Sequence, residues 1–183
     1  PLLYYSLLAF EKSRTDEIIL VVSKEDIPYC RKEIVERFQF DKVTKIIPGG
    51  EERYLSVCCG LEQTEGEYVL IHDAARPMIS IELIDYTIRK VMELSACTLG
   101  VPSKDTIKIV NEDGAITHTP DRRWVYNIQT PQAFETSLIK EAYKKMQEEP
   151  RNTVTDDAMV VENYTSSKVY VIEGDYKNIK ITT

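Results

Sequence analysis

A short run after an apolar stretch carries an acid and a base with the spacing of a ligand-binding loop. Asp73 and Arg76 follow residues 68–71 (YVLI), which predict a buried strand. In open α/β sheets, ligands bind at the carboxyl ends of the strands. A carboxylate there can hold a hard cation, and a guanidinium can hold phosphate oxygens. The heptad 71–77 therefore indicates a site for a metal–phosphate ligand, and the alternative is a surface salt bridge that caps a strand.

A second candidate lies where a predicted strand ends in paired glycines. Gly49 and Gly50 let a ligand approach the backbone closely, and the helix expected from Glu52 directs free N–H groups at the same space. Arg53 and Ser56 are three residues apart, so they can share one helix face. The alternative is a plain strand–helix turn with exposed charges.

Two segments in the middle of the chain combine hydroxyl and basic groups. Thr106 and Lys108 are two residues apart on a predicted strand, so they point to the same side and can grip a phosphate together. In the segment 121–124 (DRRW), one arginine can hold a phosphate through two hydrogen bonds. For Arg123 we prefer a solvated charge pair.

Three later segments have structural explanations of their own. Residues 129–134 (QTPQAF) suit a rigid loop before a helix. Thr155 or Asp156 is suited to capping the next helix. Lys180 lies between two apolar residues of a predicted strand, so it faces either a cleft or the solvent at a sheet edge.

The absences narrow the chemistry. The sequence has no GxxxxGK[ST] loop, no GxSxG turn and no plausible Cys–His pair, so a P-loop and a covalent nucleophile have no support. What remains is a set of Lys, Arg, Thr and Ser side chains around one acid. Such a set suits direct phosphoryl or nucleotidyl transfer, in which positioning and charge neutralisation carry the catalysis.

Composition excludes several other classes. A length of 183 residues favours one domain, and 43% hydrophobic with 29% charged residues is typical of a soluble globular protein. The net charge of −7 argues against a nucleic-acid partner, and no apolar run is long enough for a membrane helix. Four cysteines without a CxxC pair and only two histidines argue against zinc and favour a reducing, cytoplasmic setting.

Strands and helices alternate along most of the chain. This order predicts an α/β fold with a Rossmann-like, mostly parallel sheet and helices on both faces. Helices are expected at 1–10, 26–38, 52–64, 81–94, 135–148 and 157–164, strands at 17–23, 43–47, 68–71, 96–101, 169–172 and 179–181, and a loop around Pro150.

A hairpin interrupts this alternation. Residues 106–110 and 115–118 predict two short strands, and Asp113-Gly114 supplies the turn between them. The apolar face of such an insertion must be buried on something. We favour a second subunit, which gives a homodimer built through this β-arm; the alternative is packing against its own domain.

The motifs together resemble the 2-C-methyl-D-erythritol 4-phosphate cytidylyltransferase family of isoprenoid precursor biosynthesis. The matching pieces are GGEERYLSV, VLIHDAARP, VPSKDTIK, DRRW followed by QTPQAF, TDDA, and NIKITT. Their order covers nearly the whole chain, and their combination is specific. The resemblance implies one nucleotidyltransferase domain over residues 1–183 with a β-arm at about 104–128. It also implies a reaction, in which an oxygen of the alcohol phosphate attacks the α-phosphorus of CTP with Mg²⁺ and releases pyrophosphate.

The resemblance assigns roles by matched position. The residues expected against CTP are Gly50, Glu51, Arg53, Ser56 and Asp73. Those expected to bind the alcohol phosphate are Asp73, Arg76, Thr106, Lys108, Arg122, Thr130, Thr155 and Lys180. The catalytic residues would be Arg122, Lys180, Asp73 and Arg76, and the metal ligand would be Asp73. The arm of the partner subunit would supply Thr106, Lys108 and Arg122.

One departure from the family pattern bears on activity. The family opens with a strand and a Gly-rich loop whose Arg and Lys stabilise the triphosphate, and no residues here correspond to them. We therefore expect that this N-terminal segment is missing from the chain and that the chain alone is nearly inactive. Two alternatives stay open: a ribitol-5-phosphate cytidylyltransferase, which shares the same sequence frame, and a catalytically dead nucleotide-binding relative.

Overall fold

Helices and strands alternate in the computed structural model, which describes residues 1–148 and 154–182. The loop predicted around Pro150 lies outside these residues. The helices are α1 (Leu2–Lys12), α2 (Ile27–Tyr29), α3 (Arg53–Gln63), α4 (Ile81–Leu94), α5 (Thr136–Glu148) and α6 (Asp157–Tyr164). The short 3-10 helix η1 (Lys24–Asp26) leads into α2, and the π-helix η2 (Cys30–Glu36) continues it. In the described part of the chain, no helix combines the length and apolar character needed to cross a bilayer.

The strands form two sheets outside the hairpin. β1 (Ile18–Val22) and β2 (Val43–Pro48) pair in parallel. The larger sheet has the order β3-β7-β4-β8, built from β3 (Tyr68–Ile71), β7 (Tyr126–Glu135), β4 (Ala96–Pro102) and β8 (Tyr170–Glu173). β4 and β8 are parallel, whereas β7 runs antiparallel to both of its neighbours. The predicted α/β class is thus confirmed, with one reversed strand inside the larger sheet.

That reversed strand corrects one expectation. Residues 129–134 are not a loop; they belong to β7, at the centre of the sheet. Pro131 cannot donate a ladder hydrogen bond, which normally keeps proline out of a central strand. Here the pairing with β4 shifts register between Thr98 and Gly100, opposite this stretch, so the ladder is already interrupted where the proline lies.

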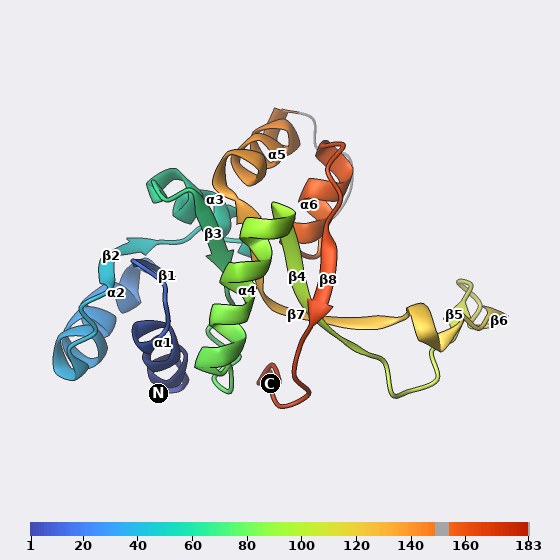
Figure 1. Cartoon of the computed structure of the whole chain (residues 1–183), viewed down its shortest axis with the longest axis horizontal. Helices are drawn as coiled ribbons and strands as arrows, with labels where there is room; N and C mark the ends of the chain where they lie inside the picture. The colour runs from blue at the N-terminus through green and yellow to red at the C-terminus, as the bar shows by residue number, and fades with distance from the viewer. Residues whose placement is uncertain (149–153, 183) are drawn as a thin grey trace.

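Neighbouring strand residues face opposite helical layers. Phe134 and Ala96 pack with apolar side chains of α3, α5 and α6. Ala133 and Cys97 pack with α1 and α4 on the other side. The predicted helices on both faces are therefore confirmed, and Figure 1 shows α5 and α6 apart from α1 and α4 around the sheet.

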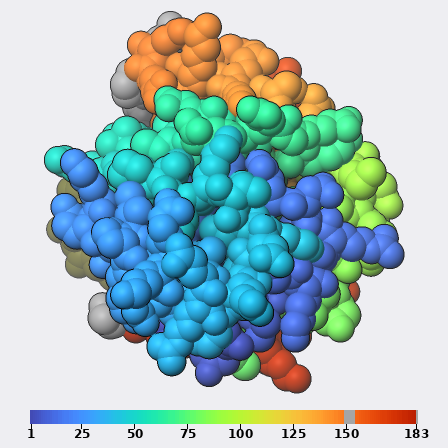
Figure 2. All heavy atoms as spheres, turned by 90° about the vertical axis from the view of Figure 1, so that its left-hand side faces the viewer, coloured from blue at the N-terminus to red at the C-terminus, as the bar shows by residue number. Residues whose placement is uncertain are grey.

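A third apolar cluster lies at the edge formed by the first part of the chain. Leu7, Leu20, Ile34 and Phe40 bury one another there, between α1, β1 and the helical segment 24–38. Figure 2 views this face, where the blue N-terminal residues are bordered above by α3 and α5. This cluster attaches the two-stranded sheet to the rest of the molecule through α1.

The predicted β-arm is present. β5 (Ile109–Val110) and β6 (Ile116–His118) form a hairpin, shorter than expected, whose turn uses Gly114 at a φ of +80°. The short turn η3 (Arg122–Trp124) follows before the chain re-enters the sheet as β7. Figure 1 shows the hairpin projecting away from the body of the molecule.

The strand predicted at residues 179–181 is absent. Among the described residues, the segment joins no sheet: the Ile181 N–H donates to the Ala75 carbonyl (2.8 Å), whereas the Ile179 N–H donates to the nearby Lys177 carbonyl (2.8 Å). The Ile181 contact lays the end of the described chain along the loop that follows β3. Lys180 is thereby brought to Asp73.

Candidate active site

Asp73 is the centre of the site. It follows β3, and its two carboxylate oxygens are held by two cations that come from opposite ends of the sequence. Arg53 Nε donates to Oδ1 (3.2 Å), and Lys180 Nζ lies 2.8 Å from Oδ2. Burial by itself would raise the pKa of Asp73, but the Lys180 hydrogen bond and the charge of Arg53 lower it below its ordinary value. The carboxylate therefore stays ionised, as a metal ligand must be.

Arg53 is itself fixed from behind by an acid that sequence reasoning missed. Its NH1 and NH2 groups donate to the two oxygens of Asp157, at 3.1 and 2.7 Å. Asp157 is fully buried at the start of α6. The sequence shows two adjacent acids at a helix start, and nothing in it indicates that one caps the helix while the other turns inward.

The glycine loop closes on its own helix. The Gly50 N–H donates to Ser56 Oγ (3.2 Å), and the same hydroxyl donates to the Gly50 carbonyl (3.3 Å). A Cβ on Gly50 would lie 2.4 Å from Leu55 Cβ, so the loop needs glycine for this close packing. Glu51 is exposed in the loop beside them. Four of the predicted CTP-binding residues are thus gathered at the start of α3, and the fifth, Asp73, is joined to them by its ion pair with Arg53.

Thr130 and His72 form hydrogen bonds that hold the loop carrying Asp73. Thr130 Oγ1 accepts a hydrogen bond from the Asp73 N–H (3.0 Å) and lies 3.0 Å from His72 Nδ1. His72 Nε2 lies 3.3 Å from the Arg76 carbonyl, so a neutral imidazole with its proton on Nε2 satisfies every partner. Thr130 is buried, and its hydroxyl holds the loop that carries Asp73.

The neutral state of His72 predicts a pH-dependent stability. Burial lowers the pKa of His72 to about 4, from an ordinary value of 6.5. Between these values the unfolded chain binds the proton and the folded chain does not, so the stabilisation is complete above pH 6.5 and is lost as the pH falls towards 4. We expect urea unfolding at pH 5 to give a free energy about 1–2 kcal/mol lower than at pH 7.

The two histidines provide the control for this prediction. His72→Phe is expected to flatten this pH dependence, whereas His118→Gln, in the exposed arm, is expected to retain it. An equal slope in His72→Phe and the unmodified protein would show that other groups cause it.

Arg76 anchors the segment that carries Lys180. Its NH1 and NH2 groups donate to the carbonyls of Asn178 (2.8 Å) and Ile128 (3.3 Å). Burial lowers the pKa of Arg76, and the charge of Asp73 opposes this effect. The structure therefore places Arg76 beside Asp73, as predicted, with two of its nitrogens engaged by backbone.

Thr155 does not cap its helix. Asp156 does, because its side chain accepts a hydrogen bond from the Met159 N–H (2.9 Å). Thr155 is exposed just before this helix start, and its hydroxyl lies 3.6 Å from Met159 Sδ. Its predicted contact with the substrate stays a prediction.

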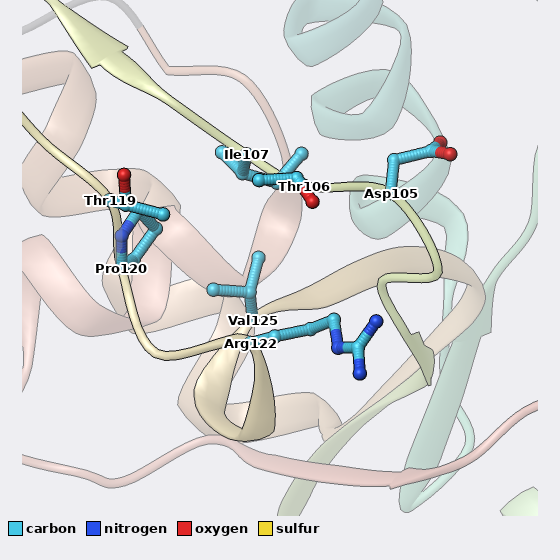
Figure 3. Close-up of a pocket in the computed structure, with 7 residues that line it drawn as sticks. All are labelled: Asp105, Thr106, Ile107, Thr119, Pro120, Arg122 and Val125. Carbon is cyan, nitrogen blue, oxygen red and sulfur yellow. The ribbon is translucent and has the colours of Figure 1, made fainter. Parts of the chain in front are cut away.

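The arm residues form a separate group. Thr106 and Arg122 line a cavity of about 110 Å³, and Figure 3 shows Arg122 and Asp105 extending on the same side of it. Lys108 Nζ donates to Thr119 Oγ1 (2.7 Å), another lining residue. The remaining lining residues are Ile107, Pro120 and Val125. Within the ranges 1–148 and 154–182, no hydrogen bond or ion pair joins this group to Asp73, so the predicted site residues fall into two separate groups.

The predicted surface charge pair in the arm is confirmed. Arg123 pairs with Asp121, two residues earlier, and its side chain is 79% exposed. Arg122, the adjacent residue, instead turns to the cavity. The arm thus separates the roles of two consecutive arginines.

The α/β fold, with an acid, two cations and a glycine loop brought together beside β3, is the arrangement of a nucleotidyltransferase. The comparisons with known proteins give the family. The profile of 2-C-methyl-D-erythritol 4-phosphate cytidylyltransferase matches residues 1–183. The chain belongs to this family.

Relatives at several levels of similarity agree. Proteins of this name from Lachnoclostridium phytofermentans and Lachnospira eligens are each 50% identical over all of this chain and 79% and 82% of their own lengths. A crystal structure of 4-diphosphocytidyl-2C-methyl-D-erythritol synthase from Anaerococcus prevotii has a TM-score of 0.91 and 38% identity, covering all of this chain and 80% of that one. The Thermus thermophilus cytidylyltransferase structure has a TM-score of 0.82 and 27% identity, covering all of this chain and 83% of that one.

Proposed function

We propose that this chain catalyses the reaction after which its family is named, joining CTP to 2-C-methyl-D-erythritol 4-phosphate with release of pyrophosphate. The observation that carries the proposal is the clamp of Arg53 and Lys180 on Asp73 beside the glycine loop. A phosphate oxygen of the alcohol attacks the α-phosphorus of CTP, and the bond from that phosphorus to the α,β-bridging oxygen breaks as the new P–O bond forms, so that pyrophosphate leaves. Fixed cations around the reacting phosphates stabilise the charge that develops there.

Mg²⁺ fits this site as a companion of the nucleotide. In the described part of the chain, no three His, Cys, Asp or Glu side chains gather to form a metal cage. Mg²⁺ commonly binds one or two carboxylates, several waters and substrate phosphates, so one protein carboxylate is enough. We propose Asp73 as that ligand. The ion would neutralise triphosphate charge, and Lys180 would then be released from Asp73 towards the alcohol phosphate.

We propose a homodimer built through the arm. The arm and the segment that leads back to the sheet expose several large apolar side chains, namely Ile109, Val110, Ile116, Trp124 and Tyr126. Trp124 is 79% exposed, and exposed apolar patches of this kind mark interaction surfaces. A second copy that covers the arm would also bring the Arg122 cavity to a partner's Asp73. The two groups of predicted site residues would then form one site.

We also propose that one further strand of the protein completes the sheet. β1 and β3 are edge strands of separate sheets, and both are apolar and only half-buried. Unpaired apolar edges are normally covered or paired. A strand between them, with the expected Gly-rich loop, would make one sheet and bring further cations to the triphosphate.

The four cysteines are free, which supports the reducing, cytoplasmic location that we propose.

A parallel assay tests the function. The full-length protein with CTP and Mg²⁺ is expected to release pyrophosphate with 2-C-methyl-D-erythritol 4-phosphate and to show little release with ribitol 5-phosphate. Release with ribitol 5-phosphate alone would overturn the choice of substrate. Calorimetry with CTP and Mg²⁺ completes the test, because CTP binding without pyrophosphate release from either alcohol would identify a dead relative.

A further inference from the structure

A buried carboxylate and a tyrosine lie behind Arg53, outside the residues assigned to the site. Asp157 is fully buried, and Tyr143 of α5 donates its hydroxyl to Asp157 Oδ1 (2.6 Å). The same carboxylate receives the NH1 and NH2 groups of Arg53. A chain of hydrogen bonds therefore runs from the core of the helical layer through Asp157 and Arg53 to Asp73.

The hydrogen bonds to two carboxylates fix the orientation of the Arg53 guanidinium. Arg53 presents five N–H donors in a rigid plane. Two of them go to Asp157, and the Nε–H goes to Asp73, so the plane of the guanidinium is set by two carboxylates at once. These contacts use three of the five donors, and the side chain as a whole is 37% exposed.

Helix stability does not explain the position of Arg53. It is the first residue of α3, and a positive charge at a helix N-terminus opposes the helix dipole. Asp157 is the first residue of α6, where a negative charge is favourable. Although burial alone would lower it, the hydrogen bonds and charge of Asp157, with those of Asp73, hold the pKa of Arg53 above its ordinary value. The dipole of α3 disfavours the charge of Arg53 at this position, and the pairing with Asp157 of α6 compensates for it.

We propose that Asp157, supported by Tyr143, is a positioning residue that fixes Arg53 for its contact with Asp73 and the nucleotide. Arg–carboxylate pairs with two parallel hydrogen bonds add geometric specificity as well as energy. The start of α3, the start of α6 and the middle of α5 thereby hold one side chain of the site. The nucleotide part of this inference rests on the proposed function; the orientation of Arg53 does not.

The first test compares KM for the two substrates. Asp157→Asn is expected to raise KM for CTP roughly tenfold, with KM for the alcohol phosphate unchanged, because the charge that pairs with Arg53 is lost while an amide oxygen can still accept the Tyr143 hydroxyl. Tyr143→Phe, which keeps Asp157, is expected to give a smaller rise in the same direction. In an Arg53→Ala background, Asp157→Asn is expected to add no further effect on KM for CTP. Fully additive effects would overturn the positioning role.

The neighbouring acid offers a matched control. Asp156→Asn makes the same chemical change one residue away, at a side chain bonded to Met159 and Gln132 instead of Arg53. It is expected to leave KM for CTP unchanged. An equal rise in both variants would mean that a disturbed α6 causes the effect and would overturn the proposal.

A second test needs no substrate. In the full-length protein, nuclear magnetic resonance should show a slowly exchanging Arg53 Nε–H signal, identified by its loss in Arg53→Ala. Asp157→Asn is expected to broaden or abolish this signal, and Asp156→Asn is expected to retain it. An unchanged signal in Asp157→Asn would refute the positioning role even if the enzyme is active. If Asp157→Asn loses the signal but the unmodified protein does not turn over CTP, only the proposed function is refuted, and the positioning of Arg53 stands.

Discussion

Asp73→Asn is expected to lower kcat/KM for nucleotidyl transfer by about 10³, the scale of losing a preorganised charged group at a reacting centre. The substitution keeps the volume of the side chain, so the fold should persist. It removes the charge that orients Arg53 and Lys180 and also the proposed Mg²⁺ ligand. Steady-state pyrophosphate release measures the loss, and the unfolding temperature verifies that the variant is folded.

A surface aspartate serves as the control for this experiment. Asp85 on α4 accepts a hydrogen bond from the Arg14 N–H (2.8 Å) and lies near the Arg14 guanidinium. Asp85→Asn removes the same charge from an ion pair outside the site, and its activity should stay within about twofold of the unmodified protein. Near-normal turnover by Asp73→Asn would remove Asp73 from the mechanism.

Arg122→Ala is expected to raise KM for the alcohol phosphate by about 100-fold and to leave CTP binding unchanged, because a two-pronged guanidinium–phosphate contact is lost. Arg123→Ala is the matched control. Arg123 is the adjacent residue and pairs with Asp121 at the surface, so its loss should change neither constant appreciably. Weaker CTP binding with normal affinity for the alcohol phosphate would contradict the role of Arg122.

Mixing the two impaired variants, at an alcohol phosphate concentration far below the KM of Arg122→Ala, tests whether the arm acts across the dimer. Random pairing of Asp73→Asn and Arg122→Ala protomers makes half of the dimers mixed, and each mixed dimer has one site with both residues intact. Activity should therefore recover to about a quarter of normal when a partner supplies the arm. No recovery, in a mixture shown to exchange subunits, would place Arg122 in the site of its own chain.

Local patterns in the sequence determined most of the elements. The apolar runs that precede Gly49 and Asp73 are strands, and the helical spacing of Ile84, Ile88 and Val91 is that of α4. These elements were predictable because burial of one face of a helix or strand imposes a regular spacing of apolar residues, which is visible in the sequence. β7 was not, because its central proline is a local signal against a strand, and only its pairing with β3 and β4 overrides that signal.

The same division applies to the site. The types and spacing of Asp73 and Arg53 indicated a phosphate site, whereas Lys180 by itself suited a solvent-facing sheet edge; the family resemblance supplied the predicted roles of all three. Only the tertiary structure decided that these three groups form one clamp, that Arg76 holds the last segment in place, and that Asp157 lies behind Arg53. Arg53 and Asp157 are 104 positions apart, and no local rule relates them. Residue types and periodicity are properties of short stretches, whereas the partner of a buried charge is chosen by the packing of the whole chain.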